Sequence, residues 1–171
     1  MKKILIGTHN KGKFKEIAYL LPKKIRKISP VALKISSPKE TGKTFSSNSK
    51  LKVNFFSKYV DYPVISDDSG LCIDALNFNP GIYSARLAKK HGSFHKAMIF
   101  ILKKMKNKKN RKATFVCSLS YKGFNNKIIT VIGRIRGNIS TEIKGKRGFG
   151  YDPIFIPLNK KITFGQMPKI K

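Results

Sequence analysis

The sequence predicts an α/β domain, and three observations support that prediction. The chain opens with a short apolar segment, a polar turn and a helical stripe of apolar residues. Segments with strand and with helix patterns then alternate along the chain. Two strand-like segments towards the C-terminus are joined by a short turn and predict an antiparallel pair. The 171 residues suffice for one domain, residues 1–171, with a buried core.

Composition excludes several protein classes. The hydrophobic fraction of 40% and the aromatic fraction of 11% are too high for a disordered chain, despite a net charge of +29. The longest strictly apolar run, 97–102, is too short to span a membrane, and the apolar start at 4–6 is too short for a secretory signal. Cys72 and Cys117 make neither a disulfide framework nor a zinc ligand set. We therefore expect a reduced, cytoplasmic protein without a membrane segment.

The first elements are predicted as strand, turn and helix. Lys3 to Gly7 is a short apolar run typical of a buried strand. A turn over 8–13 follows, with Asn10 as a candidate N-cap. Apolar residues at 14, 17, 18 and 21 then form a helical stripe, which ends at Pro22.

The middle of the chain predicts a second helix and a strand. Residues 23–43 are basic and irregular, with a strand expected near Val31–Ile35. Residues 44–60 predict a helix on whose polar face Asn48 and Lys52 lie one turn apart. Its expected apolar face comprises Leu51, Phe55, Phe56 and Tyr59. Pro63–Ser66 predicts a strand that ends in Asp67-Asp68-Ser69-Gly70.

The remaining elements follow the same patterns. A helix is expected over Phe94–Met105. Strands are expected over 113–121 and 127–135, joined by a turn at 123–126. A glycine-rich loop over 145–152 precedes a short strand at 154–156.

The large positive charge does not by itself indicate a nucleic-acid partner. The 37 cations comprise 31 Lys and only 6 Arg, spread over the whole chain, whereas readers of bases and phosphates rely on Arg. One dense run, Lys103–Lys112, holds seven cations in ten residues. A solvated helix end and loop is the favoured interpretation. The alternative, an RNA-binding segment, would be indicated by a steep salt dependence of RNA affinity that is lost when the run is neutralised.

The eight acidic residues are more informative, because three of them fall within 67–74. Adjacent carboxylates at Asp67 and Asp68 can hold Mg²⁺ or activate water, although a plain turn is the alternative. Since neighbouring side chains of a strand point to opposite sides, we expect one of the two to face a site and the other to brace the backbone. Glu40 becomes a second metal ligand only if it lies near Asp68.

Two glycine-containing turns are candidate ligand contacts. The turn at 8–13 offers backbone N–H groups at a helix start, with Lys11 and Lys13 beside them, but it lacks P-loop spacing, and an ordinary capped helix remains the simpler interpretation. The turn at 148–153 combines glycines with aromatic residues that can stack on a base, or it is simply a tight turn before a strand. The three His residues show no metal-ligand spacing.

Four blocks of the sequence, in order and spacing, resemble one known family. They read ILIGTHNKGKFKEI, ETGKTFSSNSKLK, PVISDDSGLCIDALNFNPGIYSAR and GKRGFGYDPIF. On these blocks the chain resembles the Ham1/RdgB family of inosine and xanthosine triphosphate pyrophosphatases. The resemblance implies an ITPase/Maf-like fold, with an elongated mixed β-sheet flanked by helices and two lobes around a central cleft. The Maf-like pyrophosphatases themselves lack this combination of motifs.

The resemblance also implies an activity and a set of site residues. Members hydrolyse dITP, ITP and XTP to the monophosphate and pyrophosphate with Mg²⁺, and they are usually homodimers. By position, Asp68 is implied to be the base that accepts the proton of the attacking water, and Glu40 and Asp68 to hold the metal. Substrate contacts are implied for Thr8, His9, Asn10, Lys11, Gly12, Lys13, Lys52, Ser69, Phe149, Gly150, Tyr151 and Asp152. A basic RNA- or ribosome-binding protein that has lost catalysis is the alternative function.

We expect selection of the base to depend on the substituent at the purine 6-position. This substituent donates a hydrogen bond in adenine and accepts one in hypoxanthine. A pocket that presents hydrogen-bond donors to it therefore rejects ATP. Members of the family continue past TFGQMPKIK to a Lys and a Ser-His-Arg motif that read the purine. The present sequence ends at Lys171, short of that motif. From the resemblance we expect weaker base discrimination than in longer relatives.

Overall fold

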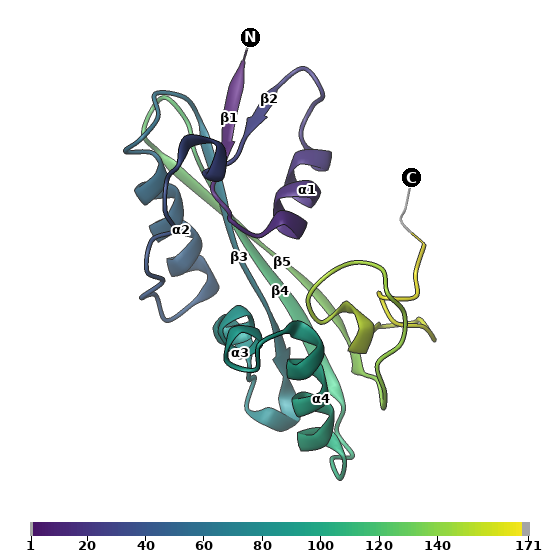
Figure 1. The fold of residues 1–171 in the computed structure, drawn as a ribbon. Helices are drawn as coiled ribbons and strands as arrows, with labels where there is room; N and C mark the ends of the chain where they lie inside the picture. The colour runs from purple at the N-terminus through teal and green to yellow at the C-terminus, as the bar shows by residue number, and fades with distance from the viewer. Residues whose placement is uncertain (1, 169–171) are drawn as a thin grey trace. The chain divides into compact units, whose positions relative to one another are not determined.

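A computed structural model describes residues 2–168 of the protein. It shows a six-stranded mixed sheet in the order β2-β1-β3-β4-β5-β6 together with four α-helices, which confirms the predicted α/β class (Figure 1). The chain forms two compact units. The first unit contains the residues up to Asp68 and Cys117–Gly133, and the second contains Ser69–Val116 and the residues from Arg134 onward. Strands β3 (Val64–Ile73), β4 (Lys112–Lys122) and β5 (Ile128–Ile139) each contribute residues to both.

The first unit begins with the predicted strand, turn and helix. Strand β1 (Lys3–Ile6) pairs in parallel with β2 (Arg26–Ile28) and with β3. Helix α1 (Lys11–Leu20) starts three residues earlier than its apolar stripe, because the side chain of Asn10 caps the backbone N–H groups of Gly12 and Lys13. The predicted N-cap is therefore confirmed.

Helix α2 (Phe45–Phe56) buries a different face from the expected one. Thr44 caps its N-terminus and forms a reciprocal capping box with Ser47. The predicted apolar face is wrong in part, since Tyr59 lies beyond the helix end and is exposed. The side chains that the helix buries are Asn48, Ser49, Lys52, Val53 and Phe56. Both residues of the expected polar face, Asn48 and Lys52, thus point into the protein. Beside them, Val53 and Phe56 join the core with Leu5, Ile35 and Val64.

Two predictions for the first half of the chain are wrong. The strand expected near Val31–Ile35 is a 3₁₀ turn over Val31–Leu33, and the strand lies earlier, at β2, where parallel pairing with β1 begins at Arg26. The strand expected to end at 67–70 continues to Ile73, so that these residues lie in the middle of β3. The turn-forming residue types misled the prediction because contacts with helices α1 and α2 satisfy the polar side chains of this strand.

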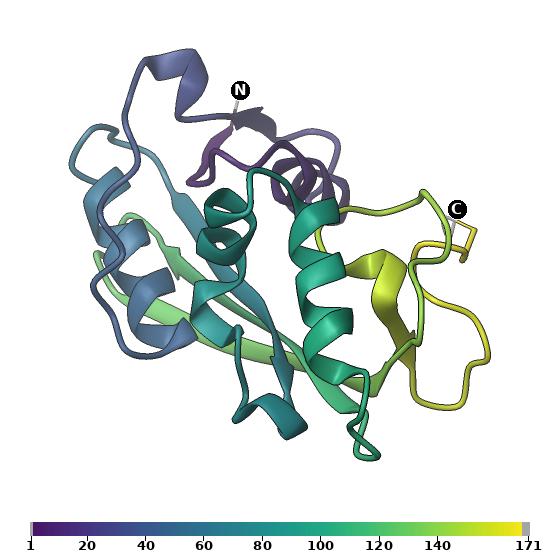
Figure 2. The same cartoon turned by 60° about the horizontal axis from the view of Figure 1, so that its bottom comes forward.

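The second unit packs two helices beside its part of the sheet. Helix α3 (Ser84–Lys90) lies against α4 (Phe94–Met105), and the pair is seen side by side in Figure 2. Helix α4 has the predicted limits, whereas α3 was not predicted, because seven residues are too short to show a clear helical period. The core of this unit contains Leu71, Ile73, Ile101, Met105, Ile139 and Phe155.

Close backbone contacts complete the second unit. A methyl group at Gly70 would lie 2.1 Å from the carbonyl oxygen of Gly81, so only glycine lets β3 approach the turn before α3. The predicted strands at 113–121 and 127–135 are confirmed as β4 and β5, which are neighbours in the sheet. The short strand β6 (Phe155–Pro157) pairs antiparallel with β5.

Candidate active site

The acidic pair on β3 lies in the interior of the first unit. Asp67 and Asp68 are 1% and 4% exposed, which is unusual for carboxylates. Lys13, in the first turn of α1, places its Nζ 2.8 Å from Oδ2 of Asp67. A buried carboxylate is stable only when such partners compensate its lost hydration, so the strand and the helix start depend on each other here.

Helix α2 supplies the second set of contacts. Asn48 donates from Nδ2 to Oδ2 of Asp68 at 3.0 Å. Lys52, one turn later, donates from Nζ to the backbone oxygen of Asp67 at 2.6 Å, and the same Nζ lies 3.5 Å from Oε1 of Glu40. Helix α1 thus contacts the side chain of Asp67, and helix α2 contacts the side chain of Asp68 and the backbone of Asp67. That one Asp faces a site while the other braces the backbone stays a prediction.

The electrostatic environment raises the pKa of Asp68 to about 6. Burial is the main cause, and the negative charge of Glu40 adds to it, whereas the hydrogen bond from Asn48 and the charges of Lys13 and Lys52 act in the opposite direction. Burial alone would lower the pKa of Lys13, but the attraction of Asp67 and Asp68 outweighs burial and raises it. At neutral pH the site therefore holds a protonated amine beside a carboxylate that is mostly ionised and able to accept a proton.

Glu40 and Asp68 are suitable ligands for a hard divalent cation. Their mutual repulsion contributes to the raised pKa of Asp68, and a cation between them would relieve it. Within residues 2–168, His, Cys, Asp and Glu side chains form no group of three that could hold a metal ion. Two carboxylates, with water and phosphate oxygens as the other ligands, are a usual protein contribution to a Mg²⁺ site. The donor set therefore fits Mg²⁺ bound together with a phosphate substrate.

The predicted contacts in the turn at 8–13 serve several purposes in the structure. The buried Thr8 accepts a hydrogen bond from the backbone N–H of Asn10 through its hydroxyl, and the side chain of Asn10 is engaged in capping α1. The ring nitrogens of His9 lie 2.9 Å from the Ile35 carbonyl oxygen and 2.6 Å from the Ser37 hydroxyl. Lys11 is exposed and Gly12 is half-buried. The side chain of Lys13 is paired with Asp67 on the acidic strand.

The remaining predicted contacts belong to the second unit. Ser69 is half-buried on β3. In the glycine-rich loop, Oδ2 of Asp152 accepts from the backbone N–H of Phe149 at 2.8 Å, and burial raises the pKa of Asp152 to about 6. Tyr151 is buried and donates its hydroxyl to the Ser84 carbonyl oxygen at 2.8 Å. Gly150, which lies between Phe149 and Tyr151 in the sequence, has a φ of 65°. The side chain of Tyr151 thus anchors the loop to the start of α3.

Two residues of the cluster were not assigned by the sequence. The sequence places Asn48 only on a polar helix face, and it predicts no partner for Asp67. The signal was the spacing of Asn48 and Lys52 one helical turn apart, because two polar residues on the side that also carries Phe56 point into the protein rather than to water.

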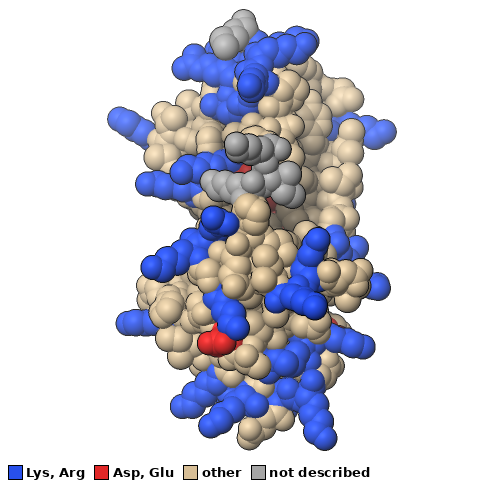
Figure 3. Space-filling model, turned by 90° about the vertical axis from the view of Figure 1, so that its right-hand side faces the viewer, with Lys and Arg blue, Asp and Glu red and all other residues tan. Residues whose placement is uncertain are grey.

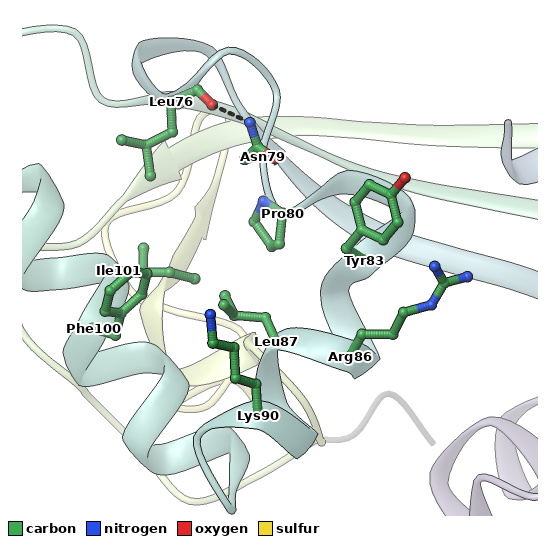
Figure 4. A pocket seen from close by; sticks show the side chains of 9 residues that line it. All are labelled: Leu76, Asn79, Pro80, Tyr83, Arg86, Leu87, Lys90, Phe100 and Ile101. Carbon is green, nitrogen blue, oxygen red and sulfur yellow. Dashed lines mark hydrogen bonds between the residues drawn. The ribbon is translucent and has the colours of Figure 1, made fainter. Parts of the chain in front are cut away.

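A separate hollow of about 360 Å³ lies in the second unit between α3 and α4 (Figure 4). Its lining is mainly apolar, with Leu87 and Phe100 among the lining side chains and Lys90 beside them. Asn79 donates to the Leu76 carbonyl oxygen at one side, at 2.9 Å. None of the predicted site residues lines it.

The chain is similar in sequence to known proteins over nearly its whole length. A sequence profile of the Ham1 family matches residues 4–171, which include every residue of the cluster. The chain belongs to the Ham1 family. It is 38% identical to a dITP/XTP pyrophosphatase of Acholeplasma laidlawii, over 96% of this chain and 82% of that protein. It is 41% identical to a dITP/XTP pyrophosphatase of Borreliella burgdorferi, over 94% of this chain and 83% of that protein.

Solved structures of Ham1 proteins have the same fold. The Staphylococcus aureus Ham1 protein superimposes with a TM-score of 0.86 at 36% identity, covering 98% of this chain and 88% of the other. The HAM1 protein of Coxiella burnetii gives 0.87 at 31% identity, covering 99% and 88%. These matches confirm the resemblance found in the four sequence blocks. Within residues 2–168 of this Ham1 member, no helix is long and apolar enough to span a membrane.

Proposed function

We propose that this Ham1-family chain hydrolyses dITP, ITP and XTP to the nucleoside monophosphate and pyrophosphate. The observation that supports the proposal most directly is the buried cluster of the first unit, in which Asp68 lies among two lysines and a second carboxylate. Relatives that carry the name dITP/XTP pyrophosphatase match almost the whole chain. A cluster of amines and carboxylates is what cleavage of a polyphosphate requires.

Asp68 acts as the base in this proposal. A water molecule attacks the α-phosphorus, the bond to the bridging oxygen of the β-phosphate breaks, and Asp68 accepts the proton of the water. Its raised pKa, about 6, leaves it ionised at neutral pH and yet a stronger base than an exposed carboxylate. Asn48 holds one carboxylate oxygen, Oδ2, at a fixed position.

The lysines bind the polyphosphate. Lys13 remains protonated because Asp67 and Asp68 stabilise its charge. Lys52 is anchored by the backbone oxygen of Asp67 and by Glu40. Both amines are positioned before the substrate arrives, so little reorganisation is needed as charge develops on the phosphate oxygens. The turn at 8–13 contributes backbone N–H groups at the start of α1.

Glu40 and Asp68 would hold Mg²⁺. When bound, the ion neutralises part of the triphosphate charge and lowers the barrier to attack. In the same proposal Ser69 would contact the substrate, and the loop Phe149–Asp152 would border the base. A hydrogen bond between Phe149 and Asp152 holds this loop in shape.

The proposal includes a homodimer. On strand β5, Ile129 and Val131 lie on one face and are 56% and 59% exposed. Adjacent exposed apolar side chains of this kind are a candidate contact surface for a second copy of the chain. Light scattering after size-exclusion chromatography measures the mass, and a monomer at micromolar concentration would contradict this part of the proposal.

A product assay tests the activity. The chain is incubated with Mg²⁺ and dITP, ITP, XTP, dATP or GTP, and monophosphate, pyrophosphate and orthophosphate are quantified separately. We expect equimolar monophosphate and pyrophosphate from dITP, ITP and XTP, and slower turnover of dATP. Release of orthophosphate would indicate a different bond cleavage, and the absence of any product would contradict the proposal.

A further inference from the structure

Asn48 connects the two segments that carry the carboxylates of the site. Its side chain is completely buried. The amide Nδ2 donates to Oδ2 of Asp68 at 3.0 Å, and Oδ1 accepts from the backbone N–H of Gly42 at 2.8 Å. Gly42 lies two residues after Glu40 in the sequence. One side chain therefore links β3 to the loop that presents Glu40.

The contact between this loop and α2 is too close for a larger residue. A methyl group on Gly42 would lie 2.5 Å from Oδ1 and 2.9 Å from the backbone nitrogen of Asn48. Neither atom can move freely, because the nitrogen is part of the helix and Oδ1 belongs to a side chain held at both ends. The loop thus rests directly on the first turns of α2.

The chemistry of the link suits an amide side chain. Asp68 offers an acceptor and the Gly42 backbone offers a donor, so the linking group must donate on one side and accept on the other. A carboxamide does both. An Asp at this position could accept from Gly42 but would present a second negative charge to Asp68, and an apolar residue would leave both buried partners unsatisfied.

We propose that Asn48 is a positioning residue that sets the spacing of Glu40 and Asp68, so that the two carboxylates bind one divalent cation together. The ion pair of Glu40 with Lys52 is longer, at 3.5 Å, than the hydrogen bonds of Asn48, and it contacts the Glu40 side chain rather than the backbone of the loop. Asn48 provides the more rigid connection. The inference rests on the proposed function in so far as the cation belongs to that reaction.

Ser49 provides a matched control on the same helix. It is equally buried, and its hydroxyl bonds to Ser118 and Ser120 on β4, at 2.9 Å and 2.8 Å. Replacing it removes buried hydrogen bonds without touching either carboxylate segment. A loss of stability common to Ser49→Ala and the Asn48 variants would therefore reflect packing. A loss of Mn²⁺ affinity confined to the Asn48 variants would reflect positioning.

The experiment uses the full chain without nucleotide and Mn²⁺ as the probe cation. Mn²⁺ affinity is measured by electron paramagnetic resonance, and hydrogen exchange is measured at the Gly42 amide by NMR. For Asn48→Leu we expect Mn²⁺ affinity to fall by about 10–100-fold, as for other residues that orient metal ligands, together with faster exchange at Gly42. Ser49→Ala should keep wild-type Mn²⁺ affinity and Gly42 exchange even where its melting temperature falls.

Two further variants separate the parts of the link. Asn48→Asp retains the acceptor for Gly42, so the Gly42 amide should stay protected while kcat for dITP falls. Gly42→Ala displaces the loop from the other side and should lower Mn²⁺ affinity with Asn48 intact. Gly42→Ala also carries the test if Asn48→Leu does not fold.

Equal Mn²⁺ affinity and equal Gly42 exchange in Asn48→Leu and Ser49→Ala would overturn the inference, as would a wild-type chain that binds no Mn²⁺. A wild-type chain that binds Mn²⁺ but releases no pyrophosphate would contradict the proposed function and leave the role of Asn48 to be judged by binding and exchange.

Discussion

Asp68 shows how one residue can be prepared for proton transfer by its surroundings. Burial and Glu40 destabilise its ionised form, while Asn48, Lys13 and Lys52 stabilise it. The balance leaves a pKa of about 6, between that of an exposed carboxyl and the working pH of a neutral solution. Such a group is ionised before the reaction and accepts a proton at a smaller cost than an exposed carboxylate.

We predict that Asp68→Asn reduces pyrophosphate release from dITP by at least about 10³-fold, because an amide cannot accept the proton. The isosteric amide keeps the shape of the side chain, so the circular dichroism spectrum should be unchanged. The exposed Asp61→Asn is the control and should retain wild-type turnover. Turnover within a few-fold of wild type in Asp68→Asn would refute the assignment of the base.

Asp152 gives a pH-dependent contribution to stability. Its pKa rises from 3.8 to about 6 on folding, because burial disfavours the ionised form. The folded state therefore holds this proton more tightly, and the stability that it contributes is complete below about pH 4 and is lost as the pH rises through about 6. At about 1.4 kcal/mol per pKa unit, the loss is at most about 3 kcal/mol.

Urea unfolding at pH 4, 5, 6 and 7 measures this effect. The Asp152→Asn variant can still accept the hydrogen bond from Phe149 but does not ionise. We expect the stability of the variant relative to wild type to increase with pH between about 4 and 6 and then to remain constant. Parallel stability curves for the two proteins would contradict the prediction.

At the scale of elements, the basic run Lys103–Lys112 has two parts. Helix α4 ends at Met105, and residues 106–110 form an exposed loop, as the favoured interpretation of the run predicts. Arg111 differs from its neighbours. Its guanidinium donates to the carbonyl oxygens of Met105, Ile139 and Ser140, and so ties the end of α4 to the end of β5.

We predict that Arg111→Met lowers the free energy of unfolding by about 2–4 kcal/mol, because three carbonyl groups lose a charged donor. Lys109→Met, in the exposed loop, should change it by less than about 0.5 kcal/mol. Urea denaturation of both variants gives the comparison. Similar small changes in the two would mean that water replaces the guanidinium without cost.

Charge dominates the molecule as a whole. The sequence carries 37 cations and 8 acids, and Figure 3 shows Lys and Arg distributed over the face in view rather than gathered in one patch. Glu40, Asp67, Asp68 and Glu142 each interact with a lysine. The excess positive charge is therefore unbalanced over most of the surface and opposes the compact state.

We predict that raising NaCl from 50 mM to 500 mM increases the melting temperature by roughly 5 °C, because screening removes about 1–2 kcal/mol of repulsion. KCl at the same ionic strength should have the same effect, since screening does not depend on the identity of the cation. A melting temperature that is flat or falls with salt would contradict the prediction.

The sequence by itself determined the α/β class, the limits of α4, the N-cap of α1 and the residues that form the acidic pair. These features depend on local patterns: apolar periodicity, capping residues, and carboxylates that stand out in a chain with few acids. The family followed from four blocks whose order and spacing are local properties too.

Only the tertiary structure decided which side chains meet. The turn-forming residues at 67–70 became a buried strand because Lys13 and Asn48, far away in the sequence, satisfy its carboxylates. The polar face of α2 became an interior face for the same reason. Burial, the raised pKa of Asp68 and the link through Asn48 arise from contacts between distant segments, and no local pattern of residues encodes such contacts.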